Sequence, residues 1–159
     1  MDEIAVAAGV SRQTVYAHYP SREALLQAMT GHVTAEVARE LDGLDLDQGT
    51  AASALERWLD ASWALLARYP VLLTPAVDAA EGDDLAVHEP VTGGLVRVLE
   101  RGRRGREFDR TMPSAWYVAA IIALGHAAGQ EVIAGRMTPA RAGVAFRESV
   151  LRICRTPPR

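Results

Sequence analysis

The sequence has one cysteine, no lysine and no surplus of positive charge among its 159 residues. Cys154 has no partner within the chain, so an internal disulfide is excluded, and its helical surroundings predict a buried, inert thiol. The formal net charge of −3 excludes the strongly basic composition that typifies many nucleic-acid-binding domains. Any contact with DNA would therefore have to come from a local surface.

Long apolar runs are also missing. No stretch approaches the roughly 20 consecutive apolar residues of a membrane-spanning helix. The N-terminus has no basic segment that leads into an apolar signal sequence. We therefore expect a cytoplasmic protein without a membrane partner.

The motifs of common enzymes are absent as well. The sequence has no nucleophile elbow, phosphate-binding loop, zinc motif or pair of carboxylates at catalytic spacing. His32 and Glu36 lie one helical turn apart, but no third ligand follows at a suitable spacing, and we interpret Glu36 as a solvated surface residue. We expect no enzymatic activity, no metal and no cofactor.

Apolar residues recur at helical spacing along nearly the whole chain, whereas no segment alternates for long with the period of two of a strand. This pattern predicts an all-α protein. Two short helices precede Pro20, and longer helices are expected near residues 21–41, 51–69, 85–101, 113–135 and 139–154. The order predicts a small N-terminal domain over residues 1–42 and a helical bundle over residues 43–159.

The most informative segment runs from Asp2 to Leu26 and reads DEIAVAAGVSRQTVYAHYPSREALL. Ile4, Ala5 and Ala8 form the apolar edge of a short helix. Gly9 permits the left-handed backbone of a tight turn, and Ser11 can cap the helix that follows. This arrangement is typical of a helix-turn-helix.

The second short helix of this segment has two different sides. Val15 and Tyr19 face the first helix and pack on it. Gln13, Thr14, Tyr16 and Ala17 point away and leave a polar face that the major groove of DNA would accept. Short helix pairs with a glycine turn also occur in proteins that never contact DNA, so both readings stay open from this pattern alone.

The run from Ile4 to Leu26 resembles the DNA-binding segment of the TetR family of transcriptional regulators, position after position and without a gap. The resemblance implies an all-helical homodimer, in most cases a repressor, that binds a palindromic operator and releases it when a small molecule binds. Arg12, Gln13 and Thr14 match positions that meet base edges. Tyr16, His18 and Arg22 match positions that hold DNA phosphates, although an exposed histidine without this role remains the alternative for His18.

The chain departs from the family at its start. A further helix precedes the helix-turn-helix in the family and packs across its back. Without that cover we expect Ile4, Val15 and Leu25 to lose apolar contacts. A start codon placed too far downstream and a genuine loss of the helix both remain open. The alternative function is accordingly a dimeric ligand-sensing protein whose truncated head does not bind DNA.

The last two long helices predict a dimer. Residues 114–135, SAWYVAAIIALGHAAGQEVIAG, are apolar on nearly all sides, which predicts a helix that is buried all round. Residues 139–154 carry apolar side chains among arginines. The two helices resemble the pair that forms the four-helix dimer interface of TetR proteins, and two ordinary core helices are the alternative.

Aromatic and polar residues of the central helices predict a ligand cavity. In the family such a cavity lies within these helices, with apolar walls and a few polar anchors. We therefore expect a small effector that is apolar or aromatic, although packing in the core is the alternative role for each tryptophan and histidine. The candidate residues are Trp58, Ser62, Trp63, His88, Glu89, Trp116, Tyr117 and His126.

The run RGRRGR at Arg101 to Arg106 resembles a nucleic-acid-binding patch by composition. Arginines at the end of a helix also complement the negative end of the helix dipole. In the family this place is a helix end and loop far from DNA, and we interpret the run as ordinary surface.

Overall fold

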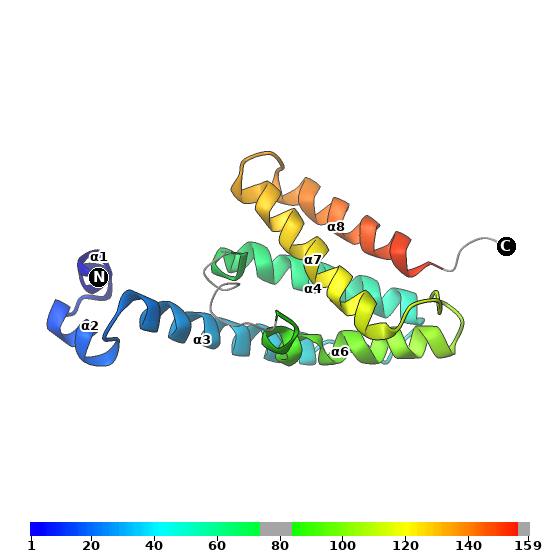
Figure 1. The fold of residues 1–159 in the computed structure, drawn as a ribbon, viewed down its shortest axis with the longest axis horizontal. Coiled ribbons are helices and arrows are strands. Elements are labelled where there is room, and N and C mark those ends of the chain that lie inside the picture. The colour runs from blue at the N-terminus through cyan, green and yellow to red at the C-terminus, as the bar shows by residue number, and fades with distance from the viewer. Residues whose placement is uncertain (74–83, 156–159) are drawn as a thin grey trace. The chain divides into compact units, whose positions relative to one another are not determined.

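The computed structural model describes residues 1–73 and 84–155, and every regular element in these two ranges is a helix (Figure 1). The prediction of an all-α protein is confirmed, and the long helices begin and end within a few residues of the predicted ranges. The helices are α1 (Asp2–Ala8), α2 (Arg12–His18), α3 (Arg22–Asp42), α4 (Ala51–Arg68), the 3-10 helix η1 (Pro70–Leu73), α6 (Asp84–Arg104), α7 (Ser114–Ile133) and α8 (Pro139–Cys154).

The chain divides into two compact units, Met1–Val33 and Thr34–Arg159. This division falls inside α3, so one helix contributes residues to both units. The sequence suggested a boundary after residue 42, at the end of that helix, and this assignment of domains stays a prediction.

The N-terminal unit contains the expected helix-turn-helix. Gly9 ends α1 with a φ of 66°, in the left-handed region that glycine enters without steric cost. The hydroxyl of Ser11 caps α2 by accepting a hydrogen bond of 3.1 Å from the backbone N–H of Thr14. Ala5 and Val15 are the buried residues of α1 and α2, whereas Ile4 and Ala8, which the pattern placed on the same apolar edge, are exposed and Tyr19 is half-buried. These local signals fix which side of α2 faces outward.

The second unit has its core among α4, α6, α7 and α8. Helix α7 packs chiefly along α8, and α4 packs chiefly on α6 (Figure 1). Burial of each large aliphatic side chain contributes roughly 1.5–3 kcal/mol to folding. The largest fully buried side chains are Leu55, Leu59, Leu95, Leu99, Ile121, Val98, Val150 and Cys154.

The loop between α6 and α7 is fixed to the end of α8. Asp109 donates its backbone N–H to the carbonyl of Cys154 over 2.9 Å, and its carboxylate accepts the hydroxyls of Thr111 and Tyr117. These hydrogen bonds, that of Thr111 first, lower the pKa of Asp109 to about 2. Burial raises the pKa of the Cys154 thiol to about 11, so the prediction of a buried thiol is confirmed.

Gly102, in the last turn of α6, packs tightly against the loop residue Phe108. A Cβ at this position would lie 2.1 Å from Cδ2 of Phe108, whose ring is buried. We expect Gly102→Ala to lower the free energy of unfolding by about 1–3 kcal/mol because the ring must move. Chemical denaturation measures the change.

Gly31→Ala is the matched control, because a Cβ there meets nothing within 4 Å. Alanine in a helix is more stable than glycine by about 0.5–1 kcal/mol, so this substitution should stabilise the protein. Equal effects of the two substitutions, or a stabilising Gly102→Ala, would contradict the contact.

One expectation about α7 is wrong in the single chain. Its apolar composition predicted burial on all sides, yet Trp116 is 58% exposed and Ile133 is 54% exposed. Ala123 and Ala127 are also exposed and lie on the same face as Trp116, seven and eleven residues further along. The helix therefore buries one side against its own unit and leaves an apolar side open.

Candidate nucleic-acid interface and ligand cavity

The outward side of α2 carries the residues expected to contact DNA. Each of them is exposed, and Val15 anchors the opposite side of the helix in the unit. The six residues are Arg12, Gln13, Thr14, Tyr16, His18 and Arg22. The structure brings the first five onto one short helix and places Arg22 in the first turn of α3.

Arg12 has partners that it can give up at low cost. Its guanidinium lies 3.2 Å from Oδ1 of Asp2, and both side chains are more than 60% exposed. It also lies 5.3 Å from the centre of the Tyr16 ring. These contacts orient the Arg12 side chain. Because an exposed ion pair contributes little to stability, Arg12 can exchange the carboxylate of Asp2 for another acceptor at low cost.

The remaining apolar residues of this unit test the expected loss of contacts. Ile4 is 39% exposed and Leu25 is partly exposed, whereas Val15 remains 6% exposed. Val15 is thus still covered by α1 and the rest of the unit, and the loss of contacts to a preceding helix stays a prediction. Val6 and Val10 are exposed too, so the unit presents further apolar surface that the sequence reading missed.

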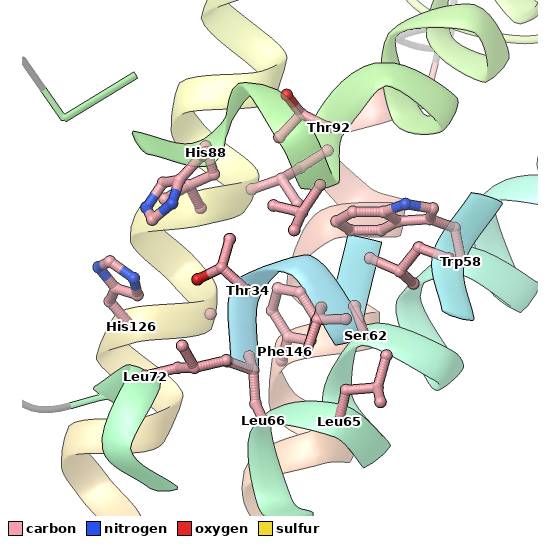
Figure 2. A pocket seen from close by; sticks show the side chains of 16 residues that line it. Thr34, Trp58, Ser62, Leu65, Leu66, Leu72, His88, Thr92, His126 and Phe146 are labelled. Carbon is pink, nitrogen blue, oxygen red and sulfur yellow. The ribbon is translucent and has the colours of Figure 1, made fainter. Parts of the chain in front are cut away.

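The second unit contains a cavity of about 100 Å³ with mainly apolar walls (Figure 2). Four of the residues predicted for a ligand cavity line it, namely Trp58, Ser62, His88 and His126. They come from α4, α6 and α7, which the tertiary structure brings together around one space. Whether they hold a ligand stays a prediction.

The other four candidates lie elsewhere. The indole N–H of Trp63 donates to the carbonyl of Pro139 over 3.1 Å, and Trp116 and Glu89 are exposed. Tyr117 is buried and donates its hydroxyl to Asp109 over 2.5 Å. Neighbouring residues of a helix point about 100° apart, so Ser62 lines the cavity while Trp63 does not.

Helix α3 provides a wall of the cavity that the sequence reading did not identify. Thr34, Val37 and Leu41 line the cavity and occupy one face of the helix, at positions i, i+3 and i+7. Phe146 from α8 completes the lining beside Gly125. The apolar spacing on α3 was the available signal, but it does not say which helices it meets.

Polar contacts fix a second face of α3. Glu36 accepts a hydrogen bond of 2.7 Å from the hydroxyl of Tyr69, and Arg68 pairs with both Glu36 and Glu40. The hydrogen bond to Glu36 raises the pKa of Tyr69. The reading of Glu36 as solvated surface is therefore wrong, because it connects α3 with the C-terminal end of α4.

No group of three or more potential metal ligands occurs in residues 1–73 and 84–155. Within the same ranges, no helix has the length and hydrophobicity needed to cross a bilayer. The run at Arg101 to Arg106 ends α6, where Arg101 bonds the carbonyl of Thr50 and Arg103 that of Met112.

The described residues form an all-helical protein with an exposed helix-turn-helix and a second unit that contains a cavity. The profile of the family described as bacterial regulatory proteins, tetR family, matches residues 1–29. A search of curated protein sequences finds no match.

Solved structures match nearly the whole chain. A tetR-family bacterial regulatory protein from Rhodococcus RHA1 has a TM-score of 0.76 at 20% identity, over 98% of this chain and 86% of its own. The TetR-like regulator LfrR from Mycobacterium smegmatis, in complex with proflavine, has a TM-score of 0.66 at 26% identity, over 98% and 85%. The regulator FadR from Bacillus subtilis, in complex with stearoyl-CoA, has a TM-score of 0.66 at 18% identity, over 96% and 84%.

Residues 1–29 match the tetR-family model, and the chain as a whole has the fold of the solved TetR-type regulators. Both of the first two matched structures are described as regulators, one a bacterial regulatory protein and the other a transcriptional regulator.

Proposed function

We propose that this protein is a DNA-binding transcriptional regulator, a repressor in the usual manner of its family, that binds a palindromic operator as a homodimer and releases it when a small molecule binds. The observation that carries the proposal is the polar outward face of α2. It is held by a buried residue behind it, and all its candidate contact residues are exposed, although Arg12 pairs with the exposed Asp2 and the hydroxyl of Thr14 bonds that of Ser11.

The residue types on α2 suit the reading of bases. Arginine pairs with guanine through two hydrogen bonds, and glutamine pairs with adenine in the same way. Arg12 and Gln13 open the helix, so their side chains would enter the groove first. Tyr16, His18 and Arg22 would hold the phosphates on either side.

The open face of α7 supports a homodimer. Exposed tryptophan, isoleucine and alanine side chains on a helix of this length are unusual for a monomer, because apolar surface of this kind gains free energy by leaving water. Val144 on α8 is 60% exposed and adds to the apolar surface of this helix pair. A two-fold dimer would read two half-sites roughly 34–36 Å apart.

The cavity supports a response to a small molecule. The structures of LfrR and FadR, which have this fold, contain proflavine and stearoyl-CoA. In this chain Thr34, Val37 and Leu41 line the cavity, and they belong to the helix that begins at Arg22. A ligand that moves α3 would therefore act on a helix whose first turn is a proposed DNA contact.

Binding of DNA is tested with labelled duplexes from the regions that flank the gene, by fluorescence anisotropy. We expect Arg12→Ala to weaken specific binding by about 1–3 kcal/mol, or about 5- to 150-fold, because a base contact is lost. Arg104→Ala is the matched control, since Arg104 is an exposed arginine on α6, in the other compact unit.

Two outcomes would oppose the proposal. Equal binding by the wild type and Arg12→Ala would show that α2 does not read the duplex. A wild-type protein that forms dimers and binds a ligand but no duplex would support the alternative, a ligand-sensing protein whose head does not bind DNA.

A further inference from the structure

The cavity of the second unit has a polar end. The imidazole rings of His88 and His126 line it and pack edge to face, with their centroids 5.2 Å apart. Figure 2 shows the hydroxyl oxygen of Thr34 on the side of these two rings, whereas Trp58 lies on the opposite side. Thr34, His88 and His126 therefore place hydrogen-bonding groups at one end of the cavity, and the indole Nε1 of Trp58, buried and without a hydrogen-bond partner among the described residues, lies at the other (Figure 2).

Thr34 differs from the other hydroxyl groups of the lining. Ser62 donates to the carbonyl of Leu59 over 2.9 Å, and Thr92 donates to that of Glu89 over 3.4 Å. A threonine inside a helix commonly bonds a carbonyl of the preceding turn in this manner. Among the described residues Thr34 makes no such bond, so its hydroxyl can donate to, or accept from, a molecule in the cavity.

The size of the cavity is suited to a small ring. Its volume is about 100 Å³. An engineered apolar cavity of about 150 Å³ binds benzene, so a space of this order takes one aromatic ring. The rings of Trp58 and Phe146 provide apolar surfaces that such a ligand would contact.

We infer that the cavity binds a one-ring organic molecule with a single oxygen-bearing head, either a phenol or an aromatic carboxylic acid. The ring lies between Trp58 and Phe146, and the head meets Thr34 and the imidazole of His126. An imidazole can donate a hydrogen bond to either head and can accept one from a hydroxyl. The inference rests on the proposed function, since it specifies the effector of that same cavity.

The test compares phenol and benzoate with toluene, which has the ring without the oxygen head. Isothermal titration calorimetry on the full chain measures each affinity. We expect phenol or benzoate to bind at least about tenfold more tightly than toluene, because the oxygen head gains a hydrogen bond with the hydroxyl of Thr34 that toluene cannot make. The probe that binds more tightly shows whether the preferred head is a hydroxyl or a carboxylate. Equal binding of toluene, or no binding of any probe, overturns the inference.

Variants locate the head and the ring. Thr34→Val has nearly the same shape, and we expect it to weaken the preferred probe by about three- to tenfold and to leave toluene unchanged. Thr30→Val, one turn earlier on α3 and outside the lining, should change neither. His126→Leu should also reduce the preference for the oxygen-bearing probe. An unchanged preference in both cavity variants overturns the placement of the head.

Gly125→Ala tests the ring. The added methyl group would lie 3.6 Å from Phe146 and 3.8 Å from Leu66, which is ordinary contact, so the variant should fold. We expect it to weaken all ring probes while their ranking is kept. Unchanged affinities would place the ring elsewhere and overturn the inference.

The ligand class and the proposed function can fail separately. If the protein binds its DNA duplex but none of the ring probes, the proposed DNA-binding function holds and the inferred ligand class is wrong. If the protein binds phenol or benzoate through Thr34 but no DNA duplex, the inferred ligand class holds and the proposed DNA-binding function is wrong. The anisotropy experiment and the calorimetry therefore report on different claims.

Discussion

Ala127→Glu is expected to convert the proposed homodimer into a monomer. Ala127 is exposed at the middle of the open face of α7, where a two-fold interface would bury it. Each interface would then contain two glutamates, one from each subunit, and a buried unpaired charge costs several kcal/mol. We expect the dissociation constant of the dimer to rise by at least about 100-fold. Sedimentation equilibrium at micromolar concentration measures it.

A matched variant separates this effect from a change in the helix itself. Ala67→Glu makes the same replacement at an exposed position of α4, outside the helix pair of the proposed interface, and should remain dimeric. The Ala127→Glu monomer should keep its helical circular dichroism, because the residue is exposed in the single chain. A dimer of unchanged affinity in this variant would contradict the α7 interface.

Leu95→Ala is expected to lower the free energy of unfolding by about 2–5 kcal/mol. The Leu95 side chain is fully buried in the second unit, so truncation removes apolar contacts and leaves a cavity. The loss is large against the roughly 5–15 kcal/mol of a typical domain. Urea denaturation followed by tryptophan fluorescence measures it, with all proteins at one protomer concentration because dimerisation adds to the apparent stability.

The neighbouring residue of α6 supplies the control. Val96 is 39% exposed, and Val96→Ala should cost less than about 1 kcal/mol because little area leaves the core. If the two substitutions cost the same, the side of α6 that faces the core is wrongly assigned.

The local elements could be predicted because their signals lie within a few residues of one another. Gly9 and Ser11 specify the turn and the cap between α1 and α2. Thr138 accepts from the backbone of Arg141 and precedes Pro139, which gives the start of α8 at the predicted residue. Backbone geometry of this kind depends on sequence neighbours and needs no knowledge of the rest of the fold.

The cavity was only partly predictable, because its lining residues lie far apart in the sequence. Composition indicated tryptophans and histidines on the central helices, but it did not say which of them share a space. Ser62 and Trp63 are neighbours in sequence, yet one lines the cavity and the other bonds the carbonyl of Pro139. Thr34 was missed because its role depends on helices far along the chain.

The sequence by itself determined the helical class, the turn at Gly9 and the residues that α2 can present, because helix periodicity and capping act over a few residues. Only the tertiary structure decided that Glu36 bonds Tyr69, that α7 leaves an apolar face open, and that Thr34 and His126 line one cavity. These features depend on the angle at which each helix meets its neighbours. Close packing of distant side chains sets that angle, and no local pattern encodes it.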